Sequence, residues 1–289
     1  MDCTPEATTD RPGTGAWKKA APAVLLALVL IVVFWPTLRW MNERFFEENS
    51  YYGHGWLIAA AIGFLLYQRR GAITRQPARP SWRGLAVAAG GLLLHLVAQF
   101  FGVNFLSAAS LPVVVIGLVL AHWGPRRARC FIGPLFLCVF MIPLPGIWII
   151  SIAFRLKLYS AAAGVALARA LGIAIVRNGI EIYLPAAPPG EVLTIGDPCS
   201  GLRSLISFGA LGGFFFFLFP LSLLRRSAIF LTAVLLAPLS NILRVVGLIV
   251  LRQTIGPGVL RGPWHVILGV LIFFLCFFIF LQVVRWLLR

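Results

Sequence analysis

The chain has 289 residues, of which 60% are hydrophobic and only 12% are charged, and its mean hydropathy is +0.92. Soluble domains carry about 25% charged residues, so this chain has too little polar side chain to cover a water-facing surface. The net charge of +16 does not indicate nucleic-acid binding, because the basic residues lie in short clusters between apolar runs without a fold for reading bases. The composition predicts an integral membrane protein.

Long apolar runs predict the fold. A helix needs about 20 mainly apolar residues to cross the hydrocarbon core, and about eight runs approach that length. We therefore expect an all-α fold, a polytopic transmembrane helical bundle that forms a single domain over residues 1–289. Residues 1–19 are expected to be a cytoplasmic tail before a retained first span, because no small-residue cleavage site follows. The predicted spans lie near Ala20–Leu38, Gly53–Tyr67, Gly84–Phe101, Phe105–His122, Phe131–Ile150, Leu202–Leu223, Ala228–Leu251 and Val266–Leu288.

The Lys and Arg residues of the short loops predict the orientation of these spans. If the N-terminus is cytoplasmic, most basic residues fall on the cytoplasmic side, as the positive-inside rule requires. The clusters concerned lie within 11–19, 69–83, 126–129, 225–226 and 285–289. Both termini are therefore expected in the cytoplasm, and the long connection 151–199 on the opposite side.

The external connection 151–199 is expected to hold a small helix and a hairpin before the sixth span. Its first part, up to residue 169, carries basic residues among apolar ones, which is typical of an amphipathic helix at a membrane surface. Ile173–Leu184 then alternates around Asn178-Gly179, a pair typical of tight hairpin turns. Glu191–Ile195 predicts one more strand.

The five cysteines have no spacing typical of a zinc site or a disulfide framework, and no His, Asp or Glu spacing supports a metal. Neither a metal nor a cofactor is therefore expected. Only Cys199 has polar and conformationally special neighbours, in the run Asp197-Pro-Cys-Ser-Gly-Leu-Arg203. Asp197 suits a helix N-cap and Pro198 the first helical position. Cys199 is then expected in the first turn of the sixth span.

The first turn of a helix favours a thiolate, because unpaired N–H groups and the positive end of the helix dipole lie there. Arg203, four residues after Cys199, shares its helix face and adds to that effect. The alternative is an ordinary helix start that contains a buried thiol.

Arg244 lies about 10 Å inside the seventh span, at 1.5 Å per residue. An arginine at that depth costs roughly 2 kcal/mol or more, so it normally faces a polar interior and serves a function. Asn241, three residues earlier, shares its helix face. The alternative is that Arg244 reaches up to the outer headgroups.

His265 precedes the last span on the predicted external side, beside Trp264. Histidine takes and returns protons near neutral pH, as acyl transfer from a thiol requires. The alternative is an interfacial polar residue, since Trp264 suits an aromatic belt. If the spans that carry Cys199, Arg244 and His265 touch, they supply a nucleophile, a cation for the oxyanion and a proton donor for the leaving group.

These motifs resemble, in order, those of the exosortase/archaeosortase family. The three main matches are Cys199-Ser-Gly-Leu-Arg-Ser-Leu, Asn241-Ile-Leu-Arg244 and Trp264-His265. Further similar stretches are Tyr52-Gly-His54-Gly-Trp-Leu-Ile, Met141-Ile-Pro-Leu-Pro145 and the segment from Gly172 to Pro185. The resemblance covers most of the chain from about Tyr51 onward, and a His at the third motif is typical of the bacterial branch.

The resemblance implies a cysteine peptidase or transpeptidase without a cofactor. Exosortases are proposed to act on exported proteins that bear a C-terminal tripartite signal of the PEP-CTERM type: a short motif, a transmembrane helix and a basic tail. Cleavage near the motif would pass through a Cys thioester, and the new C-terminus would be transferred or released. The implied catalytic residues are Cys199, Arg244 and His265, and the implied substrate-binding or supporting residues are Asn241, Arg203, Ser200 and His54.

The resemblance also implies a setting for the protein. The expected location is the inner membrane of an exopolysaccharide-producing bacterium, with the active site at the periplasmic face. The expected partners are the signal-bearing proteins, membrane lipids and the exopolysaccharide machinery.

Two other functions stay open. A transporter of polysaccharide precursors or lipids would use Arg244 and Arg203 to bind anionic headgroups, although no pair of broken helices in matching halves is evident. A non-catalytic scaffold for envelope assembly would need none of the three candidate catalytic residues.

Overall fold

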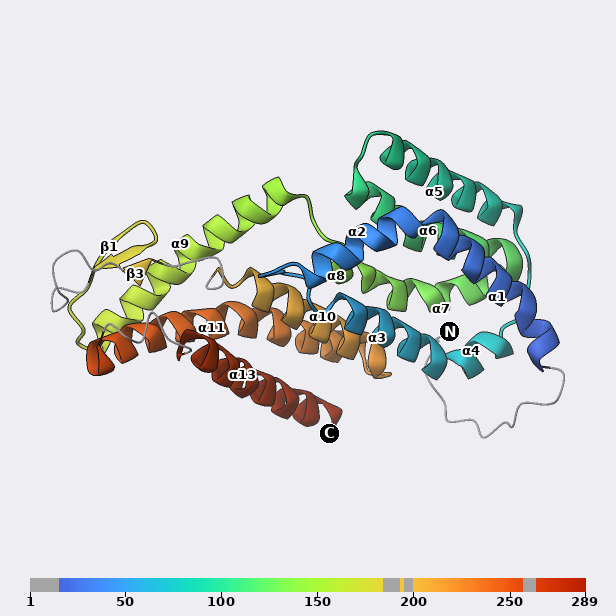
Figure 1. The fold of residues 1–289 in the computed structure, drawn as a ribbon. Helices are drawn as coiled ribbons and strands as arrows, with labels where there is room; N and C mark the ends of the chain where they lie inside the picture. The colour runs from blue at the N-terminus through green and yellow to red at the C-terminus, as the bar shows by residue number, and fades with distance from the viewer. Residues whose placement is uncertain (1–15, 184–192, 195–199, 257–263) are drawn as a thin grey trace. The chain divides into compact units, whose positions relative to one another are not determined.

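A computed structural model describes residues 16–183, 193–194, 200–256 and 264–289. Their regular elements are helices apart from one three-stranded sheet, which confirms the predicted all-α membrane bundle. The chain divides into two compact units (Figure 1). The first comprises the chain up to Pro143 together with Phe217–Pro220, and the second comprises Leu144–Phe216 and Leu221–Arg289.

Eight helices of the first unit are described. They are α1 (Ala16–Val33), α2 (Trp35–Phe46), α3 (Gly55–Gln68), α4 (Arg70–Arg75), α5 (Trp82–Phe100), α6 (Asn104–Trp123), α7 (Pro125–Phe136) and α8 (Cys138–Met141). Pro36 has no N–H to donate to the carbonyls of α1, and the chain bends by 73° between α1 and α2.

A buried histidine holds this bend. His95 of α5 is 3% exposed, and its Nε2 lies 3.2 Å from the carbonyl oxygen of Val33 at the end of α1. Because a carbonyl only accepts, Nε2 donates, and Nδ1 then accepts from the Ser107 hydroxyl at 2.8 Å. The Nε2 of Gln99 joins the cluster by donating to Ser107 Oγ at 3.1 Å. His95 is therefore a packing residue of the first unit.

The predicted fifth span, Phe131–Ile150, is wrong as a continuous helix. The structure breaks it after α7 and α8, and α9 (Gly146–Ala170) begins beyond Pro145. Pro143 and Pro145 explain the break, because proline cannot continue a helix and holds the residue before it extended. The predicted surface helix, expected from residue 151, is thus the later part of α9.

The second unit consists of α9, a small sheet, α10 (Leu202–Leu218) except its last two residues, α11 (Leu223–Ile255) and α13 (Trp264–Leu288). The strands are β1 (Val176–Asn178), β2 (Glu181–Tyr183) and β3 (Leu193–Thr194), in antiparallel order β1-β2-β3. Asn178 pairs with Glu181, so Gly179 and Ile180 form the hairpin loop. The hairpin is confirmed, with its loop one residue later than predicted. Gly179 has φ +62°, which the first loop residue of such turns requires.

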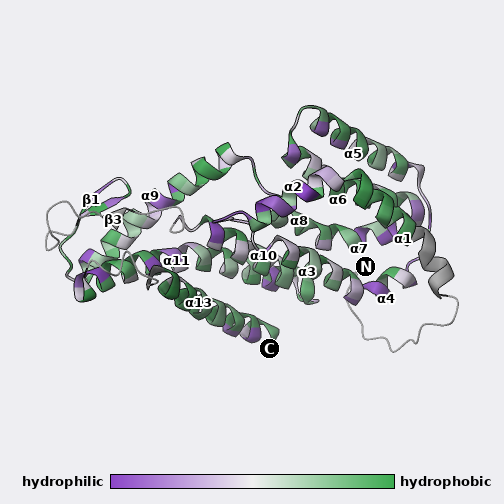
Figure 2. Cartoon of the chain, in the orientation of Figure 1, coloured by the Kyte–Doolittle hydropathy of each residue, from purple (hydrophilic) through white to green (hydrophobic). Residues whose placement is uncertain are grey.

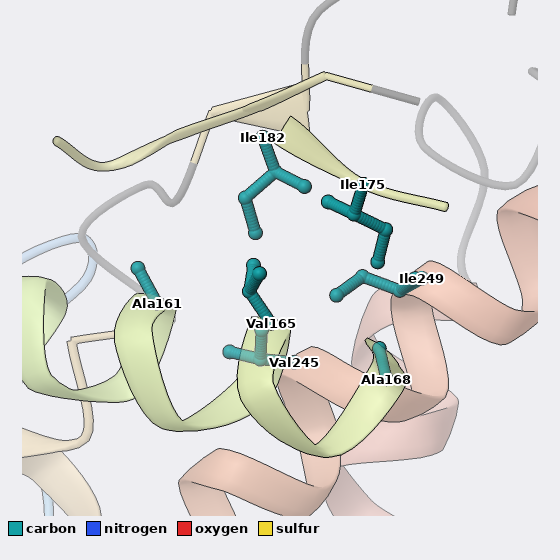
Figure 3. Packing of buried hydrophobic residues seen from close by; sticks show 7 residues of the cluster. All are labelled: Ala161, Val165, Ala168, Ile175, Ile182, Val245 and Ile249. Atoms are coloured by element: carbon teal, nitrogen blue, oxygen red, sulfur yellow. The ribbon is translucent and has the colours of Figure 1, made fainter. Parts of the chain in front are cut away.

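The hairpin packs on α9 and α11 (Figure 3). Ile182 is fully buried there, a burial that contributes roughly 1.5–3 kcal/mol for a side chain taken from water. The shared core contains Ala161, Val165 and Ala168 of α9, Ile175 and Ile182 of the hairpin region, and Val245 and Ile249 of α11.

Hydropathy agrees with a membrane location (Figure 2). Among the described residues, five helices are long and apolar enough to cross a membrane, namely α5, α6, α9, α11 and α13, and the bent α1–α2 pair makes a sixth if it is one span. α3 and α10 are shorter apolar helices. These helices correspond to seven of the eight predicted spans. In place of the predicted fifth span, α9 is the helix that is long and apolar enough to cross a membrane.

Of the described cysteines, Cys138 and Cys276 are free and buried.

Glycines set the distance between α5 and α6. A Cβ at Gly84 would collide with the backbone nitrogen of Ala121, and one at Gly117 with the backbone of Ala88. Small residues let transmembrane helices approach in this way. Gly90, in the same helix as Gly84, faces open space.

We predict that Gly84→Ala lowers the stability of the protein in detergent by about 1–3 kcal/mol, because two backbones must separate. Gly90→Ala is the matched control, and it should leave the Tm unchanged or slightly higher. Thermal unfolding of the purified variants measures this difference. Equal Tm values for the two variants would contradict the described α5–α6 contact.

Candidate active site

A tight turn opens α10 just after Cys199. The Ser200 side chain is buried, and its hydroxyl accepts the N–H of Leu202 at 3.4 Å. Gly201 has φ +78°, in the left-handed region that favours glycine, and its carbonyl accepts the N–H of Leu205 at 2.9 Å. Gly201 is therefore the N-cap residue of α10.

The predicted helix start at Pro198 is wrong, because the positive φ of Gly201 is not helical and α10 begins only at Leu202. The described start of α10 therefore lies three residues after Cys199 in the sequence. Asp197, Pro198 and Cys199 themselves lie outside the described residues.

Asn241 of α11 lies directly against this turn. It is 3% exposed, and its Nδ2 donates to Ser160 Oγ of α9 at 2.7 Å. A Cβ at Gly201 would lie 3.0 Å from both Cγ and Nδ2 of Asn241. Any larger residue at position 201 would displace the Asn241 amide, so glycine serves both the φ angle and the contact.

Arg244 lies against the last helix. It is partly buried, and a Cβ at Gly269 of α13 would lie 3.0 Å from its Cζ and 3.1 Å from its Nε. Position 265 is one turn before Gly269 on the same face of α13. The helix contains position 265, but the side chain of His265 lies outside the described part of the chain.

One polar face of α11 therefore meets three other elements. Asn241 and Arg244 are three residues apart on that face, and it contacts α9, the residue before α10, and α13. Gly201 lies two residues after Cys199 in the sequence, and Gly269 lies four residues after His265. The arrangement puts an amide donor and a guanidinium beside the segments that carry a thiol and an imidazole.

The core under the hairpin supports this face. Val245, adjacent to Arg244, is 2% exposed within the cluster that joins α9, the hairpin and α11. Its side chain lies against Gly164 of α9, where an added Cβ would be 2.6 Å from Val245 Cγ1. The hairpin itself carries a side-chain hydrogen bond, in which the Tyr183 hydroxyl donates to Glu181 Oε2 at 2.6 Å. That hydrogen bond raises the pKa of Tyr183.

The remaining predicted residues have different positions. Arg203 is exposed in the first turn of α10, and Ser200 supports the turn before that helix. His54 belongs to the first unit, where it is the N-cap residue of α3 and its carbonyl accepts the N–H of Ile58 at 3.2 Å. Within the described residues, no group of three or more His, Cys, Asp or Glu could hold a metal.

Ser160 was missed by sequence reasoning. It begins a run of small residues, Ser160-Ala-Ala-Ala-Gly164, and small residues mark close contacts between membrane helices. The basic residues nearby instead favoured a surface helix in the prediction. In the structure this small face of α9 packs against α11, and Ser160, Ala161 and Gly164 are buried.

We predict that Ser160→Ala lowers stability by about 1–3 kcal/mol, because it removes the buried hydroxyl that accepts a hydrogen bond from the Asn241 amide. Ser151→Ala in the same helix is the control, since Ser151 is exposed and its hydroxyl donates to the carbonyl of Ile147 one turn earlier. Thermal unfolding in detergent checks the pair. A Ser160→Ala protein as stable as Ser151→Ala would show that the hydrogen bond does not hold Asn241.

Comparison with known proteins gives one match. The family model described as transmembrane exosortase (Exosortase_EpsH) matches residues 40–282, a range that contains every candidate site residue. No curated protein and no solved structure matches the chain. Because the match covers most of the 289 residues, the chain belongs to the transmembrane exosortase family.

Proposed function

We propose that this membrane protein is a cysteine peptidase or transpeptidase that cleaves C-terminal sorting signals of exported proteins. The observation that carries the proposal is the contact of one polar face of α11 with Gly201 and Gly269. These glycines are close in sequence to Cys199 and His265, so the contact supports a single site for Cys199, Arg244 and His265. The membership of the exosortase family supports the same reaction class.

The first chemical step is acyl transfer to sulfur. The Cys199 thiolate attacks the carbonyl carbon of the scissile amide, and the Arg244 guanidinium stabilises the oxyanion that forms. His265 protonates the leaving nitrogen as the C–N bond breaks. The products are a Cys199 thioester and the detached C-terminal signal.

The second step returns the enzyme to its starting state. His265, now neutral, accepts the proton of an incoming nucleophile, which is water for hydrolysis or an acceptor amine or hydroxyl for transfer. The nucleophile attacks the thioester carbonyl, and the C–S bond breaks to regenerate the thiolate. Asn241, held by Ser160, keeps α11 in register with the turn that follows Cys199.

The membrane setting determines which substrates reach such a site. A substrate helix in the bilayer lies laterally against the apolar helices of the enzyme and presents its short motif at the membrane surface. Basic loop residues favour both termini in the cytoplasm, which puts the site at the periplasmic face of the inner membrane. A motif of the PEP-CTERM type, exposed after export, would then reach Cys199 from the correct side.

We predict that Cys199→Ala and Cys199→Ser each reduce processing of a signal-bearing substrate by more than about a thousandfold, as loss of a covalent nucleophile requires. Cys276→Ala, which removes a buried thiol of α13, is the control and should retain processing. Mass spectrometry of the substrate C-terminus in cells that express each variant measures the outcome, with membrane fractions blotted to confirm equal enzyme levels.

Processing retained in both Cys199 variants would remove Cys199 as the nucleophile. Transport of a lipid-linked saccharide that survives Cys199→Ala in vesicles, together with unprocessed substrate in the presence of the wild-type protein, would favour the transporter instead.

A further inference from the structure

A groove of about 650 Å³ opens in the first unit between α1, α2, α3 and α6. The 73° bend between α1 and α2 turns the end of one helix and the start of the next into adjoining walls. The apolar part of its lining comprises Leu30, Ile31, Trp35, Leu38 and Leu111. Arg39, Asn42 and Trp56 complete the lining and give the groove hydrogen-bond donors.

The donors of the groove are oriented by bonds to other residues. The indole Nε1 of Trp56 donates to Asn42 Oδ1 at 3.0 Å. Because indole N–H is a donor only, the Asn42 oxygen must face Trp56, which leaves the Asn42 NH₂ group available. Arg39 uses its Nε to donate to Glu43 at 3.0 Å. Within the described part of the chain, its two terminal NH₂ groups have no protein partner.

The polar residues belong at the level of the lipid headgroups. α2 carries two exposed ion pairs, Arg39–Glu43 and Arg44–Glu47, which are too polar for the hydrocarbon region. Trp35 and Trp56 are also substantially exposed, at 59% and 47%, and tryptophan concentrates at membrane–water interfaces. The apolar lining residues of α1 and α6 therefore extend from headgroup level toward the membrane interior.

We propose that this groove is a binding site for one membrane phospholipid. The phosphate accepts hydrogen bonds from the terminal NH₂ groups of Arg39 and from the NH₂ of Asn42, and one acyl chain lies along the apolar lining. Guanidinium is well suited to phosphate because it offers several donors in a fixed plane. Trp56 already holds the Asn42 side chain in place, and Glu43 holds that of Arg39. Both donors are therefore oriented before a lipid binds.

Size and charge distinguish a phospholipid from other occupants. A transmembrane helix is about 10–12 Å across with its side chains, so ten residues of it take up roughly 1,400 Å³, about twice the groove. A lipid without phosphate would fill the apolar part but leave the donors of Arg39 and Asn42 unused. A phospholipid satisfies both parts of the site, and it requires no assumption about the cysteine chemistry.

The test measures lipid binding to the purified full-length protein in a non-ionic detergent by native mass spectrometry. The probes are dioleoylphosphatidylglycerol and dioleoylglycerol, which share acyl chains and differ in the phosphate. We expect one tightly bound phosphatidylglycerol per protein and at least about tenfold weaker binding of dioleoylglycerol, from the loss of charge-assisted hydrogen bonds.

Two variants and one matched control locate the site. Asn42→Asp keeps an oxygen acceptor for Trp56 but replaces the NH₂ donor by an anion, and Arg39→Gln removes the guanidinium. Each should weaken phosphatidylglycerol binding by about tenfold. Arg44→Gln changes the net charge equally and also breaks an ion pair on α2, but Arg44 does not line the groove and its loss should leave binding unchanged.

Three results would overturn the proposal. Equal weakening by Arg39→Gln and Arg44→Gln would show only general surface attraction. Equal affinity for the two lipids would show that the phosphate is not recognised. Unchanged binding in both Arg39→Gln and Asn42→Asp would place the lipid elsewhere.

Discussion

The candidate active site depends on two positions where a side chain is missing. Gly201 and Gly269 face the polar side of α11, and a methyl group at either would press on Asn241 or on the Arg244 guanidinium. Because both positions lack a Cβ, the turn before α10 and the first turns of α13 approach the polar side of α11 closely. The buried hydrogen bond from Asn241 to Ser160 then fixes α9 on the same helix.

Membrane surroundings make such polar contacts consequential, since an unsatisfied polar group in hydrocarbon costs several kcal/mol. Both units show how the chain meets this constraint. In the first unit, the imidazole of His95 donates a hydrogen bond to the Val33 carbonyl at the bend between α1 and α2. Arg69, which is 9% exposed, donates to the carbonyls of Cys130 and Phe217. Arg244 of α11 is another partly buried cation, and it lies against Gly269 of α13, one turn after the candidate acid–base residue His265.

Much of the fold was predictable because it depends on local sequence. Run length located most spans, and alternation around Gly179 located the hairpin. The pairing of Asn241 with Arg244 on one face followed from spacing alone. Ser160 could not be assigned, because its role exists only once α9 packs on α11. The Asp197-Pro198 pair predicts a helix start that is too early. The true start depends on the positive φ that Gly201 adopts against Asn241, and this contact exists only in the folded protein. Likewise, the apolar run over Phe131–Ile150 predicts one span by its length, whereas two of its three prolines, Pro143 and Pro145, break the helix.

The most direct test of the shared site is the rate at which a small thiol reagent alkylates Cys199 in native membranes at neutral pH. Mass spectrometry of the peptide that contains Cys199 gives the rate, which is compared in Gly269→Ala and Gly247→Ala. Both glycines lie where α11 packs on α13, but Gly269 faces Arg244 whereas Gly247 faces the flexible end of Leu268. We expect rapid alkylation that slows several-fold only in Gly269→Ala, because the displaced guanidinium no longer stabilises the thiolate. Equal rates in the wild type and both variants would contradict a shared site.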